Sequence, residues 1–185
     1  MAKRLTTERL ILRPPVRDDL PAIAALLAEP GVAEATLSLP ASFGTSEGEA
    51  WLIACTRKDL RPHAILRNSD QMVLGTVTLA LGGQGRAAQL EFWIGRPFWG
   101  QGYATEAVRR LLRFAFGERK LRSAEAAVFP DNVAAIRVLA KTGFSEYARG
   151  RRLVPPRSGE RDVAQFVATR ASYAQAVLSQ AVGRA

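Results

Sequence analysis

The sequence is poor in cysteine and histidine, with one residue of each among its 185. Cys55 alone cannot form an internal disulfide, and the chain has no cysteine-rich metal motif, so we expect no bound metal. No apolar run approaches the roughly 20 residues that a membrane-spanning helix needs. The first ten residues carry charge with no apolar stretch behind them, which argues against a secretory signal and predicts a cytoplasmic protein.

Acidic residues are also in deficit, because 17 Asp and Glu stand against 26 Lys and Arg, for a formal charge of +9. An excess of positive charge favours anionic partners, such as nucleic acid, a membrane surface or a phosphorylated small molecule. However, the arginines are scattered, and no Lys/Arg block or aromatic–basic repeat of the kind that binds single strands is present. We therefore expect a basic surface and neither a nucleic-acid-binding nor a membrane-binding protein.

Hydrophobic residues make up 48% of the chain, enough for one globular domain with an ample core. Without a repeat, linker or low-complexity stretch, residues 1–185 are expected to form a single domain, with its motifs in 6–169 and a C-terminal tail or helix at 170–185. Hydrophobic periodicity predicts a mixed α/β domain with the order β-α-α-β-β-β-α-β-α-β-β. The expected strands are 8–15, 63–67, 72–81, 87–95, 122–129, 144–152 and 161–170, and the expected helices are 17–30, 46–60, 103–118 and 131–142.

Local signals support several of these boundaries. Ser46, with Glu49 three positions on, has the pattern of a capping box at the start of a helix. The segments 67–71 and 82–85 are expected to be hairpin turns. Residues 154–160 should be a flexible connection between the last two strands.

The stretch RPFWGQGYATEA at 96–107 places Gly100 and Gly102 between an expected strand and an expected helix. Glycine lets such a loop turn its N–H groups inward, and the unpaired amides at a helix N-terminus favour phosphate. Thr105 stands where a dinucleotide-binding fingerprint needs Gly or Ala, and no Gly-Lys-Ser/Thr follows for a P-loop. A pyrophosphate loop for coenzyme A is the reading that remains.

Three segments resemble the GCN5-related N-acetyltransferase (GNAT) family, in particular its RimJ/RimL-like branch. They are TTERLILRPPVRDDLPAIAALLAEPGV at 6–32, LEFWIGRPFWGQGYATEAVRRLLRFAF at 90–116 and NVAAIRVLAKTGF at 132–144. The resemblance runs from about Thr6 to Thr169. It implies a GNAT-like α/β fold, whose mixed, mostly antiparallel central sheet has a splayed strand pair and is flanked by helices. It also implies acetyl-CoA as co-substrate.

The resemblance further implies a set of cofactor-binding residues. The pantetheine arm would enter the gap at the splayed strand and pair with the backbone of Phe92 and Ile94, with Trp93 between them. Asn132 would lie beside the arm. The segment that would wrap the pyrophosphate is Trp99, Gly100, Gln101, Gly102, Tyr103, Ala104 and Thr105.

Positive charge for the phosphates has several candidate sources. Pro97 stands where many family members carry Arg or Gln, and either Arg96 supplies that charge or it is a solvated arginine. Arg109 and Arg113, four apart on one helix, could reach the 3′-phosphate of coenzyme A or form a solvated helix face.

Acetyl transfer to an amine requires a base, because an ammonium ion has no lone pair and alkyl amines titrate near 10. Glu91, on the strand that the family uses for its active centre, is the expected catalytic residue, acting directly or through water. It could instead hold the substrate cation or face solvent. Glu47 and Glu49 are alternative bases, whereas His63 is expected to be structural.

The acid that would protonate the leaving thiolate is harder to find. Leu139 and Ala135 occupy positions where family members carry tyrosine or serine. Tyr103 and Tyr147 could substitute, although no spacing selects them.

These residues predict an N-acetyltransferase that moves the acetyl group of acetyl-CoA to a primary amine, either a protein N-terminus or lysine or a small amine. The alternative is a non-catalytic acyl-CoA-binding or regulatory module of the same fold. Both a monomer and a homodimer are compatible with the sequence.

Overall fold

A computed structural model of the chain describes residues 3–37, 43–57, 59–82, 86–154 and 159–182. Its strands form one eight-stranded sheet in the order β1-β2-β3-β4-β5-β6-β8-β7. Neighbouring strands are antiparallel except β5 and β6, which are parallel. The strands are β1 Leu5–Thr6, β2 Leu10–Arg13, β3 Leu60–Arg67, β4 Val73–Leu81, β5 Ala87–Ile94, β6 Ser123–Val128, β7 Ser145–Leu153 and β8 Glu160–Thr169. The mixed, mostly antiparallel sheet predicted from the sequence is confirmed.

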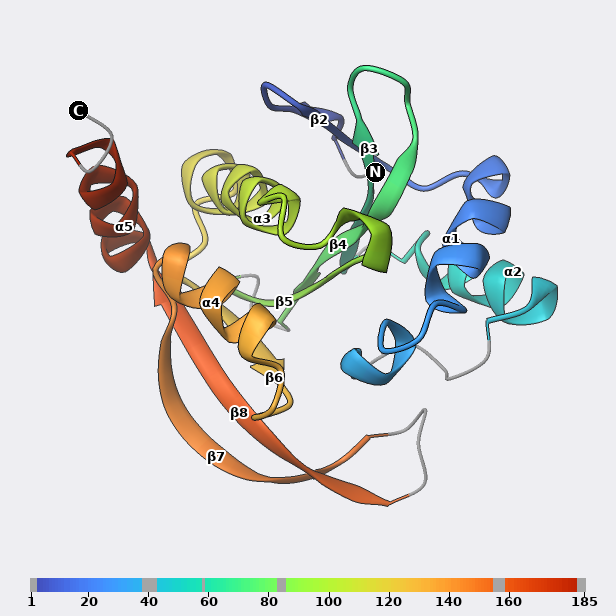
Figure 1. Cartoon of the computed structure of the whole chain (residues 1–185). Coiled ribbons are helices and arrows are strands. Elements are labelled where there is room, and N and C mark those ends of the chain that lie inside the picture. The colour runs from blue at the N-terminus through green and yellow to red at the C-terminus, as the bar shows by residue number, and fades with distance from the viewer. Residues whose placement is uncertain (1–2, 38–42, 58, 83–85, 155–158, 183–185) are drawn as a thin grey trace.

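Helices cover both faces of this sheet. They are α1 Leu20–Leu27, α2 Thr45–Ala54, α3 Tyr103–Arg113, α4 Val133–Lys141 and α5 Arg170–Val182. Figure 1 shows α3, α4 and α5 on one side of the central strands, α1 and α2 on the other, and the β7–β8 hairpin as a long curved ribbon. No helix in the described part of the chain is long and apolar enough to cross a membrane.

The core has two clusters, one on each face of the sheet, because successive residues of a strand point to opposite faces. Leu90 and Ile94 of β5 pack in the cluster that contains α3. Their neighbour Trp93 packs in the other cluster, together with Ile23 and Leu27 of α1. The strand β5 is therefore buried from both sides and holds a fixed position in the molecule.

The helix α3 owes its position to a narrow apolar stripe. Ala107, Val108, Leu111 and Leu112 are fully buried, while the residues between them are charged. Such spacing places the apolar side chains on one helix face. The helix predicted for 103–118 is present, but its last turn, Phe114–Glu118, is π-helical.

The first predicted helix, 17–30, is divided into two parts. Arg17–Asp19 forms a 3-10 turn, and α1 starts only at Leu20, with Pro21 in its first turn. Proline is tolerated there because the first helical amides have no partner within the helix. The buried carboxylate of Asp19 accepts hydrogen bonds from Arg13 and from the backbone N–H of Val16, which holds the turn against the sheet.

The capping box predicted at Ser46 is wrong. The helix α2 begins at Thr45, and the backbone N–H of Gly44 donates to the carboxylate of Glu47 at 3.1 Å. Glu49 instead forms an ion pair with Arg17 at 2.7 Å.

The remaining boundary predictions fare differently. The turn predicted at 67–71 joins β3 to β4. Most of the turn at 82–85 and of the connection at 154–160 lies outside the described residues. The C-terminal segment forms α5, and β1 is a short strand that the sequence analysis missed.

Candidate active site

The strands β5 and β6 pair along only half of β5. Their register runs from Ala87 opposite Ser123 to Leu90 opposite Ala126 and then stops. On its other side, β5 stays paired with β4 as far as Ile94. The splayed strand pair expected from the family resemblance is therefore present.

Hydrogen bonds on either side of β5 show which backbone groups face the gap. The carbonyl of Arg86 accepts from the N–H of Arg122, on the β6 side, whereas the N–H of Gly95 donates to Leu74 of β4. Because backbone groups alternate between the two sides of a strand, the N–H and C=O of Phe92 and Ile94 point into the gap. Apart from the carbonyl of Ile94, which accepts the indole N–H of Trp99, these groups form an unpaired strand edge that an extended ligand can use.

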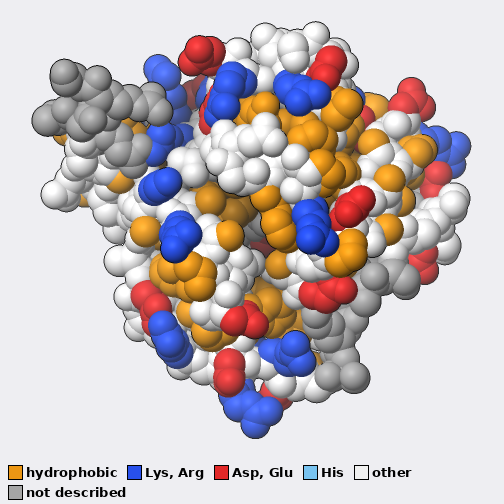
Figure 2. Space-filling model, viewed as in Figure 1, with side chains coloured by type: hydrophobic (Ala, Val, Ile, Leu, Met, Phe, Trp, Pro, Cys, Tyr) orange, Lys and Arg blue, Asp and Glu red, His pale blue; other side chains and the backbone are white. Residues whose placement is uncertain are grey.

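A cavity of about 1,420 Å³ opens at this gap. Figure 2 shows a hollow near the centre of the same view, bordered by hydrophobic side chains with Lys and Arg around them. All the predicted cofactor residues except Gln101 line the cavity, namely Phe92, Trp93, Ile94, Trp99, Gly100, Gly102, Tyr103, Ala104, Thr105 and Asn132.

The glycine loop closes one end of the cavity. Gly100 and Gly102 have φ angles of +75° and +80°, a left-handed conformation that residues with a Cβ adopt at a cost. Gly102 is the N-cap of α3, so the first amides of this helix lie beside the cavity. The indole N–H of Trp99 donates to the carbonyl of Ile94 at 2.6 Å and joins the loop to the splayed strand.

Residues near the N-terminus of the chain form hydrogen bonds to this loop and to the first turn of α3. Arg9 donates through Nε to the carboxylate of Glu106 at 2.7 Å and through Nη1 to the carbonyl of Gln101 at 3.1 Å. Thr7 donates to the same carboxylate at 2.6 Å. Burial alone would raise the pKa of Glu106, but the hydrogen bonds from Thr7 and Arg9 outweigh it and hold that pKa below its usual range. The first turn of α3 thus carries a carboxylate that Arg9 neutralises.

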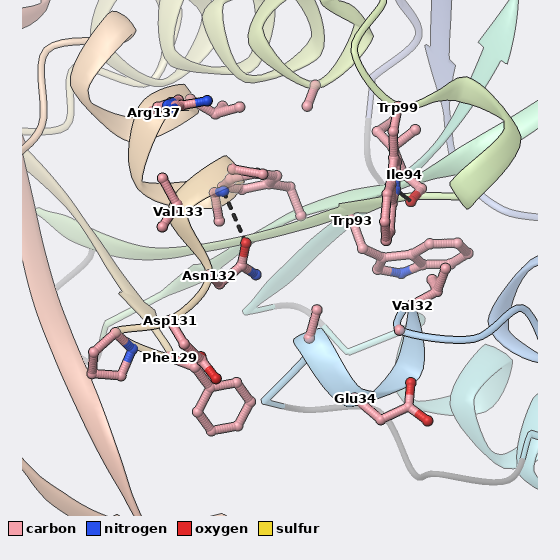
Figure 3. Close-up of a pocket in the computed structure, with 18 of the residues that line it drawn as sticks. Val32, Glu34, Trp93, Ile94, Trp99, Phe129, Asp131, Asn132, Val133 and Arg137 are labelled. Atoms are coloured by element: carbon pink, nitrogen blue, oxygen red, sulfur yellow. Dashed lines mark hydrogen bonds between the residues drawn. The ribbon is translucent and has the colours of Figure 1, made fainter.

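The opposite wall of the cavity belongs to α4. Asn132 caps this helix by accepting the N–H of Ala135 at 3.0 Å (Figure 3). Arg137 and Lys141, one helical turn apart, also line the cavity. Arg109 and Arg113 do not line it, and Arg109 donates to the carbonyl of Lys141. The sequence analysis missed Arg137 and Lys141, although their spacing on a helix that follows Asn132 was a usable signal.

A second cavity, of about 470 Å³, lies beside the first. It contains Glu91, whose side chain is exposed, with Trp51 of α2 and Arg152 of β7. The two cavities share the residues Ala35, Phe92, Trp93, Asn132 and Ala135. They meet where β5 leaves β6, so a ligand in the gap can be reached from the Glu91 side.

The other candidate residues lie away from this junction. Glu47 and Glu49 line neither cavity. Glu47 accepts a hydrogen bond from the backbone N–H of Gly44 at the start of α2, and Glu49 forms an ion pair with Arg17. His63 is fully buried outside both, with its ring nitrogens 3.0 Å and 2.9 Å from the carbonyls of Arg61 and Lys3. Arg96 is exposed beyond the cavity lining.

The candidate acids are also separated. Tyr103 is buried in the wall of the larger cavity, and the guanidinium of Arg9 stacks over its ring. Tyr147 lines neither cavity, and its hydroxyl contacts Glu125 and Gln165. The structure selects neither as the proton donor.

Comparisons with known proteins agree with this geometry. The family model described as Acetyltransferase (GNAT) domain matches residues 9–145. The chain is 37% identical over 100 residues to a probable N-acetyltransferase, YjcK, of Bacillus subtilis (strain 168). That match covers 52% of this chain and 55% of the relative, so the chain spans about half the length of that protein.

Solved structures share the fold. A spermidine N-acetyltransferase from Vibrio cholerae, in complex with CoA and spermine, has a TM-score of 0.78 at 20% identity, covering 90% of this chain and 99% of that one. The ribosomal L7/L12 α-N-protein acetyltransferase RimL, in complex with coenzyme A, has a TM-score of 0.78 at 16% identity, with 90% and 98% covered. At this level of identity the likeness establishes the fold alone.

Proposed function

The chain belongs to the GNAT family of acetyltransferases, and on that premise we propose that it transfers the acetyl group of acetyl-CoA to a primary amine. Members of this family are acyl-CoA-dependent acyltransferases. One observation carries the proposal: an unpaired strand edge, a glycine loop at a helix N-terminus and a capping asparagine line one cavity, which meets a second cavity containing a carboxylate.

The larger cavity fits coenzyme A in its chemistry. The backbone of Phe92 and the backbone N–H of Ile94 can pair with the amides of the pantetheine arm. The amides at the start of α3 suit the pyrophosphate, because they are unpaired and lie at the positive end of the helix. Arg137 and Lys141 supply cations for the 3′-phosphate. If they do so, 3′-dephospho-CoA should bind more weakly than CoA in a calorimetric titration.

The smaller cavity is the acceptor side. Glu91 is the one carboxylate among its described lining residues, and it can remove the proton from the attacking amine or hold its positive charge. Arg152 is the one cation there. A single carboxylate supports an acceptor with one amine near the reacting end, either a protein N-terminus or lysine or a small amine. The spermidine and ribosomal-protein acetyltransferases named above show that this fold serves both classes.

Calorimetric titration of CoA and acetyl-CoA tests the cofactor assignment. We expect the wild type to bind both and Gly102→Glu to bind neither, because the new carboxylate would repel the pyrophosphate. Gly117→Glu is the matched control, since Gly117 is exposed at the far end of the same helical segment, outside both cavities. If the wild type fails to bind, or if both variants bind as it does, the assignment is wrong.

A specific observation favours a second candidate, the non-catalytic acyl-CoA-binding module. Leu139 is fully buried in the core and Ala135 lines both cavities, so neither position offers a proton to the leaving thiolate. An amine-dependent release of CoA from acetyl-CoA, measured over a panel of peptide N-termini, lysine and polyamines, would exclude this module. Binding of acetyl-CoA without any release would establish it.

A further inference from the structure

The smaller cavity contains a cation without a counter-ion. Arg152, near the end of β7, lines this cavity and not the larger one. It makes no hydrogen bond or ion pair with a described residue, and the residue directly opposite it on β8 is Arg161. Both other arginines of β7 form ion pairs with glutamates, namely Arg149 with Glu146 and Arg151 with Glu160. Because like charges opposite each other repel, the guanidinium of Arg152 favours an anion.

The same cavity contains one negative group. Glu91 is the only other charged residue among the described residues that line it. Its side chain also has no hydrogen-bond or ion-pair partner in the described part of the chain, and it does not pair with Arg152. Glu34 and Asp131 line the larger cavity alone. A ligand in the smaller cavity therefore meets one carboxylate and one guanidinium at separate places.

The carboxylate has a polar neighbour that suits an amine. Thr78 of β4 lies directly opposite Glu91 and lines the same cavity. Such cross-strand partners share one face of the sheet, with Cβ atoms about 5 Å apart. The hydroxyl and the carboxylate can therefore both accept hydrogen bonds from one amino group. The adjacent residue, Phe92, lines both cavities, so an amine at this place is close to the route by which the thioester arrives.

These observations specify both ends of the acceptor. We propose that the acceptor is a small amino acid, whose primary amine lies at Glu91 and Thr78 and whose carboxylate binds Arg152. A guanidinium can hold a carboxylate through two parallel hydrogen bonds. The proposal rests on the proposed function and deepens it, because it names the class of amine.

Size and overall charge agree with an amino acid. The cavity of about 470 Å³ is in the range of small-molecule sites, roughly 300–1,000 Å³. The formal charge of +9 attracts a ligand with an anionic group and repels a polycation. A polyamine would also place a positive charge beside Arg152, where nothing in the described cavity lining offsets it.

A panel of matched acceptors tests the proposal. Glycine, leucine, β-alanine and γ-aminobutyrate are each compared with their carboxamides, and putrescine serves as the diamine. The release of CoA from acetyl-CoA gives kcat/KM for each acceptor. We expect the wild type to prefer at least one amino acid over its amide and over putrescine, because only the amino acid presents a carboxylate to Arg152. The spacing of amine and carboxylate in the best acceptor then measures the span between Glu91 and Arg152.

Arg152→Gln removes the charge and keeps a polar side chain. For the preferred amino acid, KM should rise about tenfold with little change in kcat, while the values for its amide stay the same. The ratio between amino acid and amide cancels any difference in amine basicity when the two proteins are compared. In Arg152→Glu the preference should turn to putrescine.

Arg149→Gln and Arg149→Glu are the matched controls. Arg149 lies on the same strand and lines neither cavity, so these variants make the same changes in net charge away from the acceptor. They should leave the ratio between amino acid and amide unchanged. An equal loss of preference in the variants of Arg149 and Arg152 would mean that overall charge decides the preference, and Arg152 would not be the binding group.

The two proposals fail in different ways. If the amides, putrescine or peptide N-termini are acetylated and the amino acids are not preferred, acetyl transfer stands and the amino-acid acceptor is wrong. The same conclusion follows if Arg152→Gln leaves the preference intact. If no amine of any class releases CoA from acetyl-CoA, both proposals fall, whether or not CoA binds.

Discussion

The two cavities of this protein are built from different materials. In the larger one, the groups proposed to hold the pantetheine arm and the pyrophosphate are backbone groups: the edge of β5, the glycine loop and the first amides of α3. The smaller one is made of side chains that come from separate segments, such as Trp51 of α2, Glu91 of β5 and Arg152 of β7. The first can bind a fixed ligand through groups that every residue has. The second depends on which side chains happen to be present.

This difference predicts how each cavity responds to substitution. A backbone site is lost when the chain path changes and is insensitive to most side-chain replacements around it. A site made of side chains can change its ligand when one residue is replaced. A buried polar side chain selects the ligand that pairs with it and rejects one that leaves it without a hydrogen bond. In this chain, cofactor binding and acceptor choice should therefore be separable by mutation.

The largest effect should come from Glu91→Gln, which removes the carboxylate of the smaller cavity and leaves the larger one intact. We expect the rate of acetyl transfer to fall on the order of a hundredfold, with the Kd of CoA unchanged. Glu125→Gln is the matched control, since Glu125 belongs to the neighbouring strand and lines neither cavity. A normal rate would show that Glu91 is not the base, and a weakened CoA affinity would show that the cavities cannot be separated.

A smaller effect should follow from Arg9→Ala, which removes the hydrogen bonds of Arg9 to Glu106 and to the carbonyl of Gln101 beside the larger cavity. Without Arg9, the carboxylate of Glu106 stays in the first turn of α3 with its charge uncompensated, close to the pyrophosphate. One such charge a few ångströms away should weaken CoA binding about tenfold in calorimetry. The control Arg113→Ala removes an exposed charge of the same helix and should have no effect.

The double variant Arg9→Ala/Glu106→Gln separates two explanations. If Arg9 acts by neutralising Glu106, removing the carboxylate should restore much of the affinity. If the double variant binds no better than Arg9→Ala, then Arg9 acts by holding the glycine loop through the carbonyl of Gln101.

The same contrast explains what the sequence could predict. The glycine loop, the splayed strand and Asn132 lie within short, contiguous motifs, so their place in the larger cavity followed from local chain properties and the family resemblance. The Arg9–Glu106 pair joins the segments 6–32 and 90–116, and no spacing within either segment predicts this contact. Contacts across nearly a hundred residues depend on the completed sheet.

The errors have local physical causes. The capping box at Ser46 fitted the pattern, but Gly44 and Glu47 form the same kind of contact two residues earlier. The helix predicted for 17–30 begins late because Asp19 bonds to the backbone of Val16 and to Arg13, which fixes a 3-10 turn. In both places a polar contact decides where the helix begins. Hydrophobic periodicity alone cannot tell which of two possible starting positions is used.

The smallest expected effect concerns His63, which lies outside both cavities. Its substitution should change the stability of the protein and leave CoA binding unchanged. Burial lowers its pKa below 6.5, so the folded protein favours the neutral ring. Protonation is then easier in the unfolded chain, and the free energy of unfolding should fall as the pH drops through 6.5 towards the lowered pKa. The slope for one such group is at most about 1.4 kcal/mol per pH unit.

Urea unfolding of the wild type and of His63→Gln at pH 7.5, 6.5 and 5.5 measures this slope. We expect the variant to lose most of the dependence in this range, because glutamine does not titrate. The Kd of CoA at pH 7.5 should be the same in both proteins, since His63 is held by the carbonyls of Arg61 and Lys3 and lines neither cavity. Equal slopes would mean that the ring protonates as readily in the folded chain as in the unfolded one. A change in CoA affinity would mean that the buried region around His63 on β3 is coupled to the larger cavity. The shape of that cavity would then depend on more than the glycine loop and the edge of β5.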